Sequence, residues 1–167
     1  MKTIQGPALL LSQFVSDAPP FNALAGLAKW AAGFGYQAIQ IPTHEARIFD
    51  LDLAAESPTY CDEVKGMLAD LDLEISELST HLQGQLVAVH PAYGPMFDGF
   101  APAVVRGHPA ARQEWAIDQV LKGAAVSRRL GLPASVTFSG SSDMLRTLPG
   151  SSLVKVKLSL LLLGRPR

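Results

Sequence analysis

The fold of this chain is decided by the stretch LEISELSTHLQGQLVAVHP, residues 73–91. Its first six residues, 73–78, predict a β-strand, because isoleucine and leucine recur between polar residues. The residues that follow, 81–107, hold several glycines and prolines and show no helical period, so they predict a long loop. A loop after a strand lies at the carboxyl edge of the sheet, where α/β folds bind their ligands.

Strands and helices alternate along the rest of the chain. The predicted strands are 8–11, 36–41, 73–78 and 133–139, and the predicted helices are 22–33, 58–71 and 109–130. Such alternation predicts a parallel sheet with right-handed crossovers. An eight-stranded barrel needs about 250 residues, so these elements leave two architectures open. One is a small doubly wound domain, and the other is half of a barrel.

Single residues mark the predicted ends of these elements. Pro42 closes the second strand, because proline cannot donate a ladder hydrogen bond. Ser57 is the N-cap of the second helix, and Pro58 is its first residue. Gly131 ends the third helix. The inner side of that helix is predicted from five residues: Trp115, Ile117, Val120, Leu121 and Ala124.

Two glutamates lie three positions apart in the third strand. Successive side chains of a strand point to opposite faces, so Glu74 and Glu77 are predicted on opposite sides. This argues against a proton-transfer pair. Glu77 is still a candidate site residue, because a carboxylate facing into a barrel needs a partner.

Composition excludes several classes of protein. The chain has 167 residues, 48% of them hydrophobic and 17% charged, with a net charge of -1. The near-neutral charge argues against nucleic-acid binding, which needs a basic surface. The apolar runs are too short to span a membrane, and no signal peptide is recognisable, so we expect a cytoplasmic protein. The single cysteine, Cys61, predicts a buried structural thiol.

Three segments together carry a family resemblance: GYQAIQIP at 35–42, the opening stretch at 73–91, and ASVTFSG at 134–140. They resemble the N-terminal half of a sugar phosphate isomerase/epimerase, one of the xylose-isomerase-like, AP-endonuclease-family-2-like TIM barrels. The third-strand segment is the most specific of the three. The resemblance covers about residues 1–140. It implies an α/β fold that is a partial (β/α)8 TIM barrel, with about the first four strands and three helices and a parallel sheet.

The chemistry that the resemblance implies depends on a divalent metal: Mn²⁺, Mg²⁺ or Zn²⁺. The metal polarises a carbonyl and a hydroxyl of an open-chain sugar or sugar phosphate, and a carboxylate moves a proton between adjacent carbons. The family's metal ligands come from later strands, so no metal ligand and no catalytic residue is assigned in this chain. The family often has an acid at the end of the second strand, where this chain has Gln40.

Five residues are candidates for binding the sugar: His81, Gln83, His44, His90 and Glu77. The resemblance places His81 at the mouth, in contact with substrate hydroxyls. A neutral imidazole offers one donor and one acceptor for that role. Packing or hydrogen bonding within the loop is the alternative for His81, His90 and Gln83. His44 follows the second strand beside Glu45, which is no metal-ligand spacing.

Residues 141–167 differ from residues 1–140. They hold five basic residues and one acid, whereas residues 1–140 hold nine basic and fourteen acidic residues. The resemblance also stops at this point. We therefore expect 141–167 to be foreign to the barrel, out-of-frame or divergent, and the chain alone to be an inactive, truncated fragment. Four strands cannot close a barrel, so self-association through open sheet edges is expected. The apolar strand residues expected to face the barrel interior without partners are Leu9, Leu11, Ile39, Ile41, Ile75 and Val136.

Two other functions stay open at this stage. The chain could be a complete small α/β binding or interaction module without catalysis, with its apolar tail as a last strand or a partner contact. A barrel endonuclease is a third reading, and the lack of a basic surface argues against it.

Overall fold

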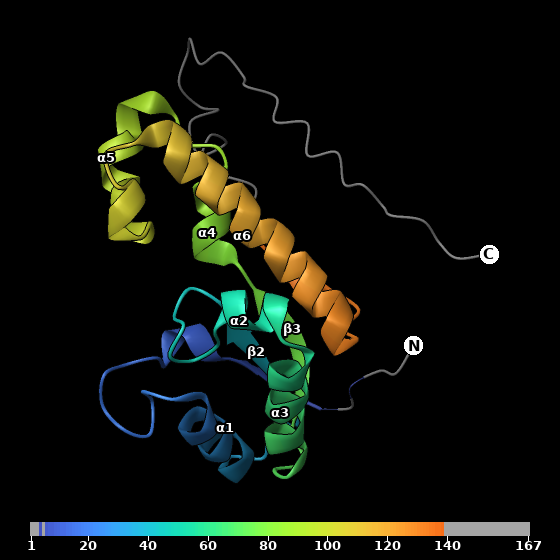
Figure 1. The fold of residues 1–167 in the computed structure, drawn as a ribbon. Helices are drawn as coiled ribbons and strands as arrows, with labels where there is room; N and C mark the ends of the chain where they lie inside the picture. Colours follow the sequence, from blue (N-terminus) through green and yellow to red (C-terminus); the bar gives the residue numbers. More distant parts are fainter. Residues whose placement is uncertain (1–3, 5, 139–167) are drawn as a thin grey trace, which may run out of the picture.

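The computed structural model describes residue 4 and residues 6–138 (Figure 1). The described residues form a four-stranded, all-parallel sheet in the order β1-β2-β3-β4. The strands are β1 (Ala8–Leu10), β2 (Ala38–Pro42), β3 (Glu74–Ser79) and β4 (Ser135–Val136). The α/β class and the parallel sheet are therefore confirmed.

Six α-helices connect or flank these strands. The three predicted helices are α1 (Leu24–Gly33), α3 (Pro58–Ala69) and α6 (Pro109–Leu130). Three short helices were missed: α2 (Leu51–Glu56), α4 (His81–Gln85) and α5 (Gly94–Phe97). Short 3₁₀ turns cover Leu11–Gln13, Pro91–Tyr93, Asp98–Phe100 and Ala103–Val105. The stretch 81–107 is thus a chain of short helical turns, each too brief to show a helical period in the sequence.

The predicted element ends are partly correct. The Ser57 side chain accepts a hydrogen bond from the backbone N–H of Tyr60 at 3.2 Å, as an N-cap does. Gly131 follows α6 in the left-handed conformation, at φ 77°. Pro42 ends the second strand as expected: it is the last residue of β2 and pairs with Ser79, one position beyond the predicted end at 41.

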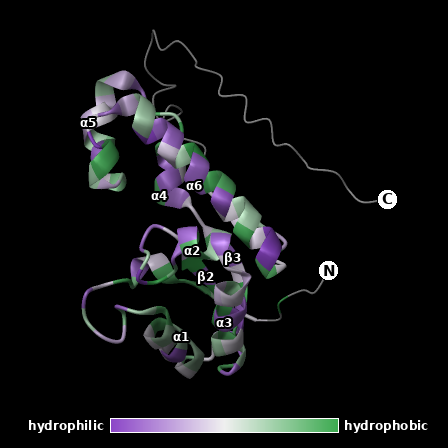
Figure 2. Cartoon of the chain, viewed as in Figure 1, coloured by the Kyte–Doolittle hydropathy of each residue, from purple (hydrophilic) through white to green (hydrophobic). Residues whose placement is uncertain are grey.

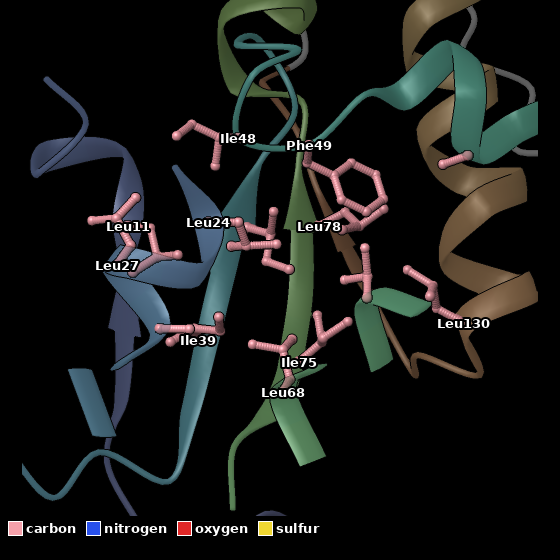
Figure 3. Packing of buried hydrophobic residues seen from close by; sticks show 14 of the residues in the cluster. Leu11, Leu24, Leu27, Ile39, Ile48, Phe49, Leu68, Ile75, Leu78 and Leu130 are labelled. Carbon is pink, nitrogen blue, oxygen red and sulfur yellow. The ribbon is translucent and has the colours of Figure 1, made fainter. Parts of the chain in front are cut away.

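The sequential strand order determines where the helices lie. A chain that always steps to the next neighbour through right-handed crossovers places every crossover helix on the same side. Accordingly, Ile39, Ile41, Ile75 and Leu78 join residues of α1, α3 and α6 in one buried cluster. Figure 3 shows Ile39, Ile75 and Leu78 in this cluster together with Phe49.

This packing corrects one expectation. Apolar strand residues, including Ile39 and Ile75, were expected to face a half-barrel interior without partners. They are buried instead, at 0% and 9% exposure, under the helices. Of the same set, only Val136 is exposed, at 38%. Cys61 is also in the core, and its thiol donates a hydrogen bond to the Ala54 carbonyl at 3.4 Å.

The inner side of α6 was predicted only in part: Trp115 and Val120 pack against a buried cluster, whereas Ala124 is exposed. The buried residues of α6 are Arg112, Ala116, Gln119, Gly123, Val126, Ser127 and Leu130, whereas Ile117 and Leu121 are exposed. Two of the buried polar side chains have specific partners: Arg112 pairs with Asp98, and Gln119 donates to Asp52 at 3.2 Å. A hydropathy pattern cannot anticipate such partners, so it missed Arg112 and Gln119 and included the exposed Ile117 and Leu121.

A second, smaller cluster packs beside the amino-terminal part of α6. It holds Leu86, Val87, Ala101 and Ala116. In Figure 1, α4 and α5 lie at the end where α6 begins, away from α1. No helix of the described part is both long and apolar enough to cross a bilayer.

Candidate functional site

The carboxyl ends of three neighbouring strands are joined directly to one another. The Thr43 N–H donates to the carbonyl of Ser79 at 3.1 Å, which joins the ends of β2 and β3. The Thr80 N–H donates to the carbonyl of Val136 at 2.9 Å, which joins β3 to β4. These bonds continue the parallel ladder one residue beyond the strands. The residues that follow are therefore held at one edge of the sheet.

A buried amide reinforces this edge. Gln83, on α4, is 1% exposed, and its Nε2 donates to the carbonyl of Thr43 at 3.0 Å. The same nitrogen lies 3.1 Å from Thr43 Oγ1. Gln83 was predicted to contact the sugar. The structure places it beneath the edge, where it fixes the residue before His44, and its buried Oε1 has no partner in the described part of the chain.

Two of the predicted histidines meet at this edge. The rings of His44, after β2, and His81, at the start of α4, lie edge to face with centroids 5.4 Å apart. The ring of Phe138, after β4, meets the His81 ring at 5.9 Å in the same geometry. Both imidazoles are half-buried, whereas Phe138 is 49% exposed. Three successive strands thus contribute one ring each to a continuous aromatic surface.

Ser79 orients the His81 ring. Its hydroxyl, 1% exposed at the end of β3, lies 2.8 Å from His81 Nδ1. A hydrogen bond at Nδ1 fixes the ring and the tautomer, and leaves Nε2 for a ligand. The His44 ring differs, because its Nδ1 is buried and has no hydrogen-bond partner among the described residues.

Burial keeps both rings neutral. Burial lowers the pKa of His81 below the ordinary value of 6.5. Burial also lowers the pKa of His44, and the nearby His81 ring lowers it further, against a smaller opposing effect of Glu45. At pH 7 each imidazole is therefore mainly uncharged. A neutral imidazole can both donate to and accept from a hydroxyl group.

Glu77 lies on the other side of the sheet from the core. Its Oε1 accepts a hydrogen bond from Gln40 Nε2 at 2.6 Å. The register pairs Ala38 with Glu74 and Gln40 with Glu77, so β3 has one extra residue in this interval. This bulge brings Glu74 and Glu77 to the same face, and the prediction of opposite faces was wrong. Strict alternation cannot anticipate a bulge.

His90 makes its contacts within its own loop. It is exposed, and its Nδ1 accepts a hydrogen bond from the Ala92 N–H at 3.2 Å as the cap of a 3₁₀ turn. Its ring contacts Tyr93 at 5.9 Å. The structure therefore brings together His44, His81 and Gln83, with Glu77 on the strand that leads to His81, whereas His90 contacts Ala92 and Tyr93.

Sequence reasoning missed Thr43, Ser79 and Phe138 as members of the site. Each lies at the end of a strand or within two residues after it. That position is the signal that could have identified them, because residues at the carboxyl ends of parallel strands share one edge.

The described residues do not supply the ligand set of the metal that the resemblance implies. Within residue 4 and residues 6–138, no three histidine, cysteine, aspartate or glutamate side chains lie together as metal ligands. His44 and His81 are two nitrogen donors, and Ser79, hydrogen-bonded to His81, contributes a hydroxyl. No metal-dependent step is assigned to these residues.

Comparison with known proteins adds no assignment. No model of a protein family matches the chain, and no curated protein matches it.

Proposed function

We propose that this chain supplies the first half of a (β/α)8 barrel of the sugar phosphate isomerase/epimerase type. Its contribution is a binding surface for an open-chain sugar or sugar phosphate at the carboxyl edge of the sheet. The order of the strands supports the barrel fold in this proposal. In the doubly wound orders, the chain reverses direction and helices cover both faces. Here the order β1-β2-β3-β4 never reverses.

The observation that carries the binding proposal is the edge-to-face pair of His44 and His81 beside Phe138. A sugar presents hydroxyls that need both donors and acceptors, and neutral imidazoles provide both. A sugar also presents C–H groups, which pack on an exposed aromatic ring. In this proposal His44 and His81 bind and orient hydroxyls, Phe138 packs against carbons, and Gln83 and Ser79 position the rings.

The test is equilibrium binding to a panel of ketoses, aldoses and their phosphates, followed by calorimetry or ligand-observed NMR. One lost hydrogen bond costs about 0.5–1.5 kcal/mol, so His44→Ala and His81→Ala should each weaken binding roughly 2- to 10-fold. His90→Ala is the matched control and should leave the affinity unchanged. Absence of binding to every member of the panel would overturn the proposal, as would an equal loss in His90→Ala.

A further inference from the structure

A carboxylate lies on the strand that leads to the histidine pair. Glu77 and Ser79 are two residues apart in β3, so their side chains point to the same face of the sheet. Leu78, between them, belongs to the buried core on the opposite face. Figure 2 shows hydrophilic residues on α4, which follows β3 and begins at His81. The Ser79 hydroxyl is 2.8 Å from His81 Nδ1, so Glu77 is the next side chain on this face before the residue that contacts His81.

The Glu77 carboxylate has acceptor capacity beyond its bond to Gln40. A carboxylate can accept about four hydrogen bonds and donates none, and Gln40 Nε2 supplies one at 2.6 Å. Glu77 is half-buried, so water screens its charge only in part. A sugar hydroxyl can donate to this group, whereas the oxygens of a phosphate dianion only accept and carry charge of the same sign. Hydrogen bonding and charge therefore favour the same ligand, one with hydroxyls and no phosphate.

The positive charge that follows the second strand is already paired. Arg47, three residues after His44, donates to Asp17 at 2.8 Å and to Glu45 at 3.2 Å. Burial lowers the pKa of both imidazoles, so they carry little positive charge near pH 7. Proteins commonly bind phosphate through the charge of arginine or lysine. Neither Arg47 nor the imidazoles therefore offset the charge of Glu77.

We propose that Glu77 makes the histidine edge selective for an uncharged sugar over the same sugar carrying a phosphate. This inference rests on the proposed sugar binding and names its substrate class. Two residues of a strand span about 7 Å, so a ligand held by His81 lies roughly 10 Å from Glu77. At that distance and at low salt, one carboxylate weakens the binding of a dianion about threefold or more.

The test compares ketoses with their own phosphates by calorimetry on the full-length chain, beginning with fructose and fructose 6-phosphate. At an ionic strength of about 10 mM, the unchanged chain should bind the uncharged sugar at least about threefold more tightly. Glu77→Gln removes the charge and keeps an acceptor for Gln40, so the ratio of the two dissociation constants should fall close to one. Glu63→Gln is the matched control. Glu63 is exposed on α3, which covers the other face of the sheet, so the ratio should not change.

Salt tests the same charge without a substitution. Raising the ionic strength to about 1 M shortens the Debye length to about 3 Å, so the preference of the unchanged chain should shrink toward one. Equal or tighter binding of the phosphates at low salt would overturn this inference and leave the proposed sugar binding intact. An unchanged ratio in Glu77→Gln, with its circular dichroism spectrum retained, would also overturn it. Absence of binding by every sugar and phosphate of the panel would overturn the proposed function, and this inference with it.

Discussion

Gly84 provides the sharpest test of how the site is assembled. It lies in α4, and a Cβ added there would lie 2.3 Å from the Phe138 carbonyl oxygen and 2.3 Å from Thr137 Oγ1. Ordinary van der Waals contact needs about 3.5 Å, so Gly84→Ala must move α4 and the end of β4 apart by about 1 Å. Because His81 lies on α4, the same movement separates His81 from Phe138.

The expected cost follows from two opposing effects. Forcing an extra methyl group into a packed site costs about 1–3 kcal/mol. Replacing glycine by alanine in a helix contributes up to about 1 kcal/mol in the other direction. We therefore expect Gly84→Ala to lower the free energy of unfolding by about 1–2 kcal/mol, measured by urea denaturation. It should also shift the NMR signals of the His81 ring.

Gly66 provides the matched control. It lies in α3, and nothing lies within 4 Å of an added Cβ. Gly66→Ala should therefore raise the free energy of unfolding by about 0.5–1 kcal/mol. The reasoning is refuted if Gly84→Ala stabilises the chain as much as Gly66→Ala and leaves the His81 signals in place.

Three further predictions concern the core, the pH dependence and a helix cap. Phe49→Ala should lower the free energy of unfolding by about 3–5 kcal/mol in chemical denaturation, because Phe49 is fully buried. Phe34 is 71% exposed, so Phe34→Ala is the control and should change the free energy of unfolding by less than about 0.5 kcal/mol. The folded chain holds the pKa values of His44 and His81 below 6.5, so the unfolded chain binds more protons as the pH falls through that value. The free energy of unfolding should therefore decrease below about pH 6.5, and these two groups should not affect it above that pH. Replacing both histidines by glutamine should flatten the dependence of the melting temperature on pH below about pH 6.5. Ser57→Ala should cost about 1 kcal/mol by removing the cap of α3, and an unchanged melting temperature would contradict the cap.

The sequence predicted the elements whose ends are marked by individual residues. Helix 109–130 was predicted at its observed bounds, because proline begins it and Gly131 ends it. The strand before His81 was predicted one residue too early in the sequence. What failed depended on tertiary contacts. Arg112 and Gln119 are buried because Asp98 and Asp52 meet them, and the bulge in β3 reverses the expected placement of Glu74 and Glu77.

The candidate site was predictable only as a location. The carboxyl edge followed from parallel topology, and His44 and His81 were both proposed there. Their contact, and the support from Ser79, depend on the register between β2 and β3. No local pattern determines that register. His90 was grouped with them only because it follows in the same loop, and in the structure its ring caps the 3₁₀ turn Pro91–Tyr93.

The boundary proposed at residue 140 lies outside the described residues, as do residues 141–167.

The most direct test of sugar binding at the carboxyl edge uses the four histidines as internal probes. The chain is labelled with ¹⁵N, and the ring-nitrogen signals of His44, His81, His90 and His108 are followed as a ketose or ketose phosphate is added. Binding at the proposed edge predicts saturable shifts for His44 and His81, with His90 and His108 unchanged. Unchanged signals for the pair across the whole panel, or equal shifts for all four rings, would contradict the account.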